Sequence, residues 1–175
     1  MKKLREILSK QKIGGYIIPK NDEYFNEYVH DSKDRLKFIS NFSGSAGFAV
    51  ILKNKNYLFV DGRYTIQAKR QSGKNFEIIT IPKIFPKQVL KSKKKIILGY
   101  DPKLHTEKQL NYLFKIKNVD LKPINLNLID SIWSKKPKEK LKKFFFLPDK
   151  VSGGSSKKKV LELTKYLDQN KFDFL

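Results

Sequence analysis

The chain has 175 residues, 39% hydrophobic and 13% aromatic, which suits one ordinary domain and the beginning of a second. It contains no cysteine, which excludes disulfides, thiolate nucleophiles and cysteine-based metal sites. A formal net charge of +21 raises nucleic acid or an anionic membrane surface as a partner. Nearly all of this charge is lysine spread along the chain, however, and the arginines are only Arg5, Arg35, Arg63 and Arg70. We therefore favour a solvated lysine-rich surface and regard nucleic acid as an unlikely partner.

Membrane segments are not evident in the sequence. No stretch approaches the roughly 18 consecutive apolar residues of a membrane span. The first residues are basic, but polar residues from Glu6 onward interrupt any apolar run of signal-peptide length. The absence of cysteine fits a reducing compartment. We expect a cytoplasmic protein without a membrane partner.

The first predicted element is a helix with Leu4, Ile7 and Leu8 at helical spacing, ended by the glycines at 14–15. A short β-rich run follows over 16–19. Asp22 is then expected to cap a short helix that contains Tyr24, Phe25 and Tyr28. A further helix is predicted from about Asp34 to Phe42, with candidate core positions Leu36, Phe38 and Ile39.

A β-hairpin is predicted next. The apolar runs 48–52 and 57–60 are separated by a polar tetrapeptide with turn chemistry. The sequence Asp61-Gly62-Arg63-Tyr64 ends the second strand, and a helix is predicted over 65–71.

The rest of the first domain alternates between strand and helix patterns. Strands are predicted over 76–81, 96–100 and 119–121, and a short helix over 87–90. Thr106 is expected to cap a helix that carries Leu110, Tyr112, Leu113, Phe114 and Ile116. Strands that alternate with helices, and that include one antiparallel hairpin, predict an α/β fold: a mixed β-sheet flanked by helices.

The composition changes after a compact apolar segment that ends at Trp133. Residues 134–156 are rich in lysine, glycine and serine, which is typical of a linker. An amphipathic helix is predicted from about Lys157, and residues 172–175 look like the start of a buried strand. We therefore predict a first domain over 1–133, a linker over 134–156, and over 157–175 the truncated start of a second α/β domain.

Motifs that would indicate a self-sufficient active site are lacking. His30 and His105 lie far apart and outside metal-ligand spacings, and the candidate carboxylates stand on unrelated segments. The small-residue cluster Gly44-Ser45-Ala46-Gly47 has neither nucleophile-elbow nor phosphate-loop spacing, so a packing role is favoured. We predict no catalytic residue and no metal ligand in this chain.

The segment Asp61-Gly62-Arg63-Tyr64 allows two interpretations. In the first, the aspartate of an Asp-Gly turn caps the following helix. In the second, Arg63 and Tyr64 are displayed at a strand end, where α/β proteins build their sites. The residues favour neither over the other.

An ordered series of short motifs resembles the N-terminal domain of Xaa-Pro aminopeptidases. Each motif is common by itself, but their order over residues 4–133 is specific. The series consists of Tyr16-Ile17-Ile18-Pro19, Asp22, Glu27-Tyr28, Arg35, Phe38-Ile39-Ser40, Phe42, Gly44-Ser45-Ala46-Gly47, Asp61-Gly62-Arg63-Tyr64, Gln67-Ala68, Gly99-Tyr100-Asp101-Pro102 and Asn127-Leu128-Ile129-Asp130-Ser131-Ile132-Trp133.

This resemblance implies a creatinase/prolidase N-terminal domain, ribonuclease H-like in fold, that belongs to a longer cytosolic enzyme. In that enzyme two divalent metal ions of the Mn type, held in a separate catalytic domain of the pita-bread fold, would cleave a peptide with proline in the second position. The resemblance also implies a homodimer, and a role for the N-terminal domain in dimer contacts and in the wall of the substrate cleft. The residues expected near the cleft or interface are Arg63 and Tyr64, followed by Arg35 and Phe42.

The sequence departs from the family pattern at two positions. Asn41 stands where the family has glycine, and Phe59 where tryptophan is common. If the backbone at 41 needs a positive φ, asparagine is the best substitute for glycine. Two alternative functions remain: a basic nucleic-acid-binding module, supported by charge alone, and a stand-alone scaffold domain without peptidase chemistry.

Overall fold

The computed structural model describes residues 1–91, 94–139 and 143–173. These residues fall into two compact units, Met1–Glu139 (unit 1) and Lys140–Leu175 (unit 2). Within the described ranges, every helix is too short or too polar to cross a membrane.

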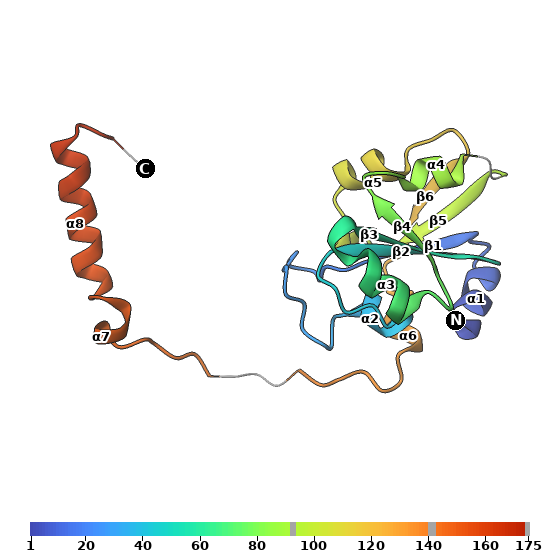
Figure 1. Ribbon diagram of the computed structural model, residues 1–175, viewed down its shortest axis with the longest axis horizontal. Helices are drawn as coiled ribbons and strands as arrows, with labels where there is room; N and C mark the ends of the chain where they lie inside the picture. The colour runs from blue at the N-terminus through green and yellow to red at the C-terminus, as the bar shows by residue number, and fades with distance from the viewer. Residues whose placement is uncertain (92–93, 140–142, 174–175) are drawn as a thin grey trace. The chain divides into compact units, whose positions relative to one another are not determined.

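Unit 1 is built on a six-stranded sheet with the strand order β4-β3-β2-β1-β5-β6 (Figure 1). The strands are short and rich in β-branched and aromatic residues, which favour a pleated, buried surface. Their bounds are β1 Gly15–Pro19, β2 Gly47–Leu52, β3 Asn56–Asp61, β4 Glu77–Ile81, β5 Ile96–Tyr100 and β6 Val119–Pro123. Every predicted strand of the first domain is present.

The sheet is mixed because β2 runs against all the other strands. It pairs antiparallel with β1 on one side and β3 on the other, while β3–β4, β1–β5 and β5–β6 are parallel pairs. The β2–β3 pair is the predicted hairpin, with Ile51 opposite Asn56 beside the turn. The predicted α/β fold with a mixed sheet flanked by helices is confirmed.

Helices cover both faces of the sheet (Figure 1). One face packs against α1 (Lys2–Lys10), α2 (Arg35–Ser40), α3 (Thr65–Ser72) and α6 (Leu128–Ile132), and the other against α4 (Pro86–Leu90) and α5 (Glu107–Phe114). Phe42 and Phe114 are among the fully buried side chains of the two cores. Burial of a side chain of this size contributes about 1.5–3 kcal/mol, so the two apolar layers hold the sheet between them.

Several local predictions are confirmed by cap geometry. The Thr106 hydroxyl accepts a hydrogen bond from the Gln109 amide, as a helix cap should. Asn41 ends α2 in the left-handed conformation with φ 64°, which explains why asparagine can stand where glycine is usual. Phe38, by contrast, was predicted to be a core residue but is 37% exposed, because its ring stacks on Trp133 at the surface, with ring centroids 4.5 Å apart.

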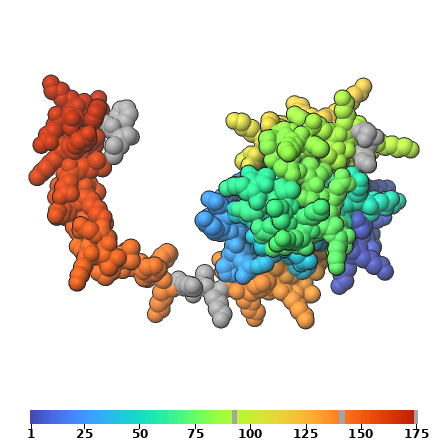
Figure 2. All heavy atoms as spheres, viewed as in Figure 1, coloured from blue at the N-terminus to red at the C-terminus, as the bar shows by residue number. Residues whose placement is uncertain are grey.

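Unit 2 contains the helices α7 (Asp149–Ser152) and α8 (Ser156–Gln169). The predicted helix near Lys157 is therefore present, capped by the Ser155 side chain, which accepts a hydrogen bond from the Lys158 amide. The atoms of α8 are drawn in orange to red in the space-filling view (Figure 2), and its apolar residues Val160, Leu161, Leu163 and Tyr166 are 40–61% exposed. Residues 172–173 form no strand, and the remainder of the predicted final strand, 174–175, lies outside the described residues.

Candidate functional site

The strands β1 and β3 finish at the same end of the sheet, which we call the carboxyl end. Both run antiparallel to β2, and the register places Phe48 opposite Pro19 on one side and opposite Phe59 on the other. The segments that follow β1 and β3, and the one that precedes β2, therefore meet there. In α/β sheets this is the end where binding sites are usually built.

Arg63 lies on the 3-10 turn Gly62–Tyr64 (η1) that follows β3. The Asp61 carboxylate accepts hydrogen bonds from the Arg63 amide and from Arg63 Nε, both at 2.9 Å. The bond from the guanidinium lowers the pKa of the Asp61 carboxyl. Capping by the aspartate is thus confirmed, although the cap closes the 3-10 turn rather than α3 directly. The Arg63 side chain remains 73% exposed, which leaves most of its donors free.

Tyr64 joins Arg63 to the buried Phe42. Its ring packs edge-to-face on Phe42 with centroids 5.8 Å apart, and the Arg63 guanidinium carbon lies 5.5 Å from the centroid of the Tyr64 ring. The Tyr64 hydroxyl is 2.9 Å from Ser45 Oγ. A Cβ at position 44 would collide with both aromatic rings, so Gly44 makes their contact possible. The small-residue cluster therefore has the packing role that its sequence favoured.

Arg35 belongs to a separate cluster of charges at the other end of α2. Its guanidinium donates to both oxygens of Asp130, at 3.0 and 2.8 Å, and to Glu23 at 2.7 Å. Its side chain is only 3% exposed. Lys33 and Lys136 add ion pairs to Glu23 and Asp130, at 3.1 and 3.0 Å. The cluster ties the segment after β1 to α2 and α6.

The carboxylates of this cluster stay ionised in acid. Partial burial alone would raise the pKa of Glu23, but hydrogen bonds from its own backbone, from Arg35 and from Lys33 outweigh burial and lower the pKa to about 2. The pKa of Asp130 is lowered in the same way, since hydrogen bonds from Arg35 and Lys136 exceed the effect of its burial. Such pairing fixes the backbone of the segment that carries Glu23.

The segment 22–28, which we call the aromatic loop, is not the predicted helix. The buried Asp22 carboxylate accepts hydrogen bonds from the amides of Tyr24 and Asn26, at 3.0 and 3.1 Å, and from the Asn26 side chain at 2.9 Å. An aspartate side chain that accepts hydrogen bonds from the backbone amides just after it stabilises a turn instead of a helix, and residues 22–28 form such a turn. As a result Tyr24 and Tyr28 project outward, 80% and 86% exposed.

The aromatic loop follows β1 and η1 follows β3, so both leave the sheet at its carboxyl end. The pKa of Arg63 is raised mainly by its hydrogen bond to Asp61, and among the smaller contributions is the negative charge of Glu27. The carboxyl end therefore carries the exposed guanidinium of Arg63 on η1 and the exposed rings of Tyr24 and Tyr28 on the aromatic loop. The sequence singled out Arg63 and Tyr64 but missed Tyr24 and Tyr28, and the short spacing from Asp22 to Asn26 was the available signal.

The four predicted site residues fall into two groups. Arg63, Tyr64 and Phe42 are in contact, whereas Arg35 lies in the ion-pair cluster, and both Arg35 and Phe42 are buried. Their location at a cleft or interface stays a prediction.

The ordinary signs of metal binding or acid-base catalysis are weak in the residues that the structure describes. No group of three histidine, aspartate or glutamate side chains among them is placed to hold a metal ion. His30 Nδ1 is 2.8 Å from Ser32 Oγ on the surface. His105 directly precedes the cap of α5, and burial lowers its pKa to about 4. The described residues thus do not form a metal centre.

A mixed six-stranded sheet with helices on both faces, and exposed polar and aromatic side chains at its carboxyl end, defines an α/β domain. Residues 1–131 match the model of the creatinase/prolidase N-terminal domain family, and the chain belongs to that family. The resemblance found in the short motifs is thereby confirmed.

The chain is also similar in sequence to curated proteins named as Xaa-Pro aminopeptidases. The chain is 35% identical to a probable Xaa-Pro aminopeptidase P of Coprinopsis cinerea, over 96% of this chain and 28% of that protein. A probable Xaa-Pro aminopeptidase P of Aspergillus fumigatus is 33% identical over 97% of this chain and 27% of its own length. The chain thus spans little more than a quarter of the relatives it matches.

Solved structures agree on the fold. The X-prolyl aminopeptidase of Caenorhabditis elegans, described as a cytosolic enzyme with a di-nuclear active site, superposes with a TM-score of 0.73 at 26% identity, covering 97% of this chain and 31% of that one. The N-terminal domain of the cytoplasmic peptidase PepQ from Mycobacterium tuberculosis gives a TM-score of 0.57 at 20% identity, covering 74% of this chain and 95% of that domain. The second likeness concerns the fold alone.

Proposed function

We propose that residues 1–133 act as the non-catalytic N-terminal domain of an Xaa-Pro aminopeptidase, with the carboxyl end of the sheet forming part of the wall of the peptide cleft. The parent enzyme would hydrolyse the N-terminal residue ahead of proline in the cytoplasm, with two divalent metal ions of the Mn type held outside these residues. The observation that carries the proposal is the exposure of Arg63, Tyr24 and Tyr28 at the carboxyl end, where the ion pair of Glu23 with the buried Arg35 holds the loop of the two tyrosines.

Each side chain suits a different task in such a wall. Arg63 has donors left over for the carbonyl or carboxylate oxygens of a peptide. Exposed tyrosines offer flat apolar faces with a polar tip, which suits contact with apolar residues such as proline. Arg35 and Phe42 are buried and would act by position, Arg35 by holding the aromatic loop and Phe42 by supporting the Tyr64 ring.

We also propose the domain boundaries predicted from the sequence: 1–133, a linker over 134–156, and the start of a second α/β domain at 157. The support is a repeated helix ending. After α1, the amides of Gln11, Lys12 and Ile13 donate to the carbonyls of Ile7, Ser9 and Leu8; after α8, the amides of Asn170, Lys171 and Phe172 donate to the carbonyls of Tyr166, Asp168 and Leu167. Lys12 and Lys171 share a positive φ, 55° and 52°. Since α1 leads directly into β1, α8 is suited to lead into the first strand of a second unit.

A kinetic experiment tests the cleft proposal. Residues 1–175 alone should not cleave a fluorogenic Xaa-Pro peptide with Mn²⁺, whereas a longer protein that contains them should. In that protein, Arg63→Ala should raise KM for peptides about tenfold, since one hydrogen bond to a charged group is worth about 1.5 kcal/mol. Arg70→Ala is the matched control. Arg70 is also exposed, but it lies in the last turn of α3, the end of that helix that is farther from η1.

Three outcomes would contradict the proposal: activity of residues 1–175 alone, inactivity of the longer protein, or equal kinetics for the Arg63 and Arg70 variants. The proposal includes homodimer assembly of the parent enzyme. Sedimentation of the longer protein checks that part separately, and a monomer at micromolar concentration would remove it.

A further inference from the structure

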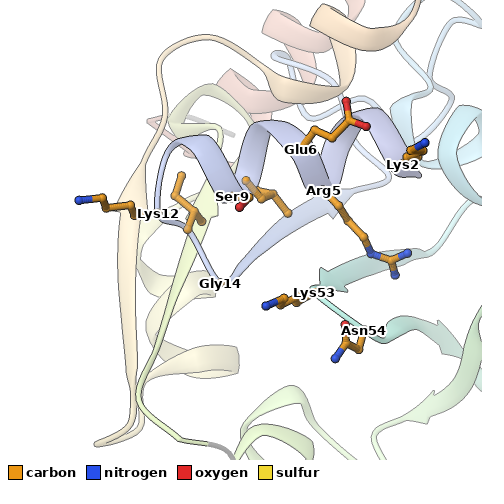
Figure 3. A pocket seen from close by; sticks show the side chains of 10 residues that line it. Lys2, Arg5, Glu6, Ser9, Lys12, Gly14, Lys53 and Asn54 are labelled. Atoms are coloured by element: carbon orange, nitrogen blue, oxygen red, sulfur yellow. The ribbon is translucent and has the colours of Figure 1, made fainter.

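A groove lies at the opposite end of the sheet, which we call the amino end. The register pairs Gly15 with Leu52, so the turn between β2 and β3 comes next to the segment that joins α1 to β1. Between them is a space of about 710 Å³ (Figure 3), within the range of small-molecule and peptide sites. We call it the basic groove; its lining residues include Lys2, Arg5, Glu6, Ser9, Lys12 and Lys53.

The charges around the basic groove are strongly unbalanced. Lys2, Lys12 and Lys53 are exposed, and none has an ion-pair partner among the described residues. Glu6 is the only carboxylate in the lining. Figure 3 shows Lys12 on the α1 side and Lys53 on the turn across from it. Unpaired like charges around the rim of one concave space attract an anion.

Arg5 shapes the groove rather than contributing a free charge. Its Nε donates to the Leu52 carbonyl at 3.2 Å, and Nη2 donates to Asn56 Oδ1 at 2.8 Å. Both bonds connect the middle of α1 to the base of the β2–β3 turn. They therefore fix the distance between the two walls of the groove. Leu8 and Ile13, which belong to the core, lie at the bottom of the groove.

We propose that the basic groove binds an acidic peptide segment whose carboxylates pair with Lys2, Lys12 and Lys53 and whose apolar side chain lies over Leu8 and Ile13. A second copy of this chain is disfavoured, because its net charge of +21 would oppose the contact. Nucleic acid is disfavoured because the arginine fork, the preferred partner of phosphate, is already engaged within the chain. Nor does an apolar floor match a sugar-phosphate backbone.

Fluorescence anisotropy tests this proposal with a short fluorescein-labelled peptide of glutamates around a central leucine. The groove variant Lys2→Gln/Lys12→Gln/Lys53→Gln should bind about tenfold more weakly than the unmodified chain at physiological ionic strength. The control Lys74→Gln/Lys83→Gln/Lys108→Gln removes the same charge from exposed lysines elsewhere and should lose less than about twofold. Thermal unfolding verifies that both variants remain folded.

A second variant separates the groove from the general charge. Ser9→Trp places a large side chain in the groove from an exposed position of α1 and should remove peptide binding without a loss of net charge. An equal loss of affinity in the groove and control lysine variants would overturn the proposal, because binding would then reflect the net charge alone. Tighter binding of a labelled oligonucleotide, weakened in the groove variant, would overturn it in favour of a nucleic-acid site.

Discussion

The two ends of the sheet in unit 1 each hold an arginine, but the two arginines differ in burial and in the charge of their partners. At the carboxyl end, Arg35 is buried between the carboxylates of Glu23 and Asp130. At the amino end, Arg5 is half-buried and donates only to uncharged oxygens, while Lys2, Lys12 and Lys53 have no ion-pair partner among the described residues. An ion pair with a buried arginine fixes a loop in place, whereas unpaired lysines create a positive potential that attracts an acidic partner. The carboxyl end is thus held in one conformation by its ion pairs, and the amino end carries an excess of positive charge.

The largest expected effect is the loss of the buried arginine. Arg35→Met removes three hydrogen bonds to carboxylates that keep Lys33 and Lys136 as ion-pair partners, and the loss of such charge-assisted bonds should cost about 3 kcal/mol. Arg5→Met, the same change at the amino end, should cost less, about 1.5 kcal/mol, since the half-buried guanidinium donates only to uncharged oxygens. Urea unfolding measures both. Equal losses would show that the two ends do not differ in this respect.

A smaller effect is expected from Gly44→Ala. The added methyl group meets the rings of Phe42 and Tyr64, and overpacking of this kind costs about 1–3 kcal/mol. It should also change the near-ultraviolet circular dichroism of the tyrosine. Gly62→Ala is the control, because its nearest neighbour would be Thr80 Cγ2 at 3.9 Å. A stable Gly44→Ala protein with an unchanged spectrum would mean that the aromatic contact is not tightly packed.

Lys12 and Asn41 have a positive φ and follow helices of unit 1, and substitutions at them should change the free energy of unfolding by about 1 kcal/mol. Lys12→Gly at the amino end should stabilise the protein, because a lysine pays a steric cost in the left-handed region. Asn41→Gly at the carboxyl end should be nearly neutral, since asparagine tolerates that region, and Asn41→Ala should destabilise. Thermal unfolding ranks the three. A stabilising Asn41→Ala would contradict the assigned backbone geometry.

The most specific test is acid titration of stability. The pKa of Glu23 is lowered to about 2 in the folded protein, below an unfolded value of about 4.3. Its contribution to stability is therefore complete above about pH 4.3 and is lost as the pH falls toward 2. Glu23→Gln should flatten the loss of stability in that window, and Glu6→Gln at the amino end serves as the charge-matched control. An unchanged slope in Glu23→Gln would exclude Glu23 as a source of the acid sensitivity.

Much of the sheet could be predicted because its signals are local. Apolar runs over 48–52 and 57–60, a turn between them and a Thr106 cap all act within a few residues of themselves, and all are present. The same is true of the left-handed Asn41. The predicted helix over the aromatic loop was wrong because Asp22 can serve either as a helix cap or as the acceptor in a turn, and the sequence alone does not decide between them.

The site was predictable only in part because its contacts are long-range. Nothing local indicates that Arg35 meets Asp130, 95 residues further along the chain, and so Arg35 was expected at a surface rather than in a buried pair. Phe42 and Tyr64 were singled out separately, and only the fold brings their rings together. The basic groove has no motif at all, since it is produced by the spatial convergence of α1 and the β2–β3 turn.

The reversed direction of β2 also bears on how the protein is made. Because β2 is antiparallel to both neighbours, β1, β2 and β3 can pair through connections that are complete once residue 61 has been synthesised. The parallel pair of β1 with β5 must wait for residues 96–100, and that of β5 with β6 for residues 119–123. Contacts of low sequence separation form first, so a nascent chain on the ribosome would build this sheet from its centre outward.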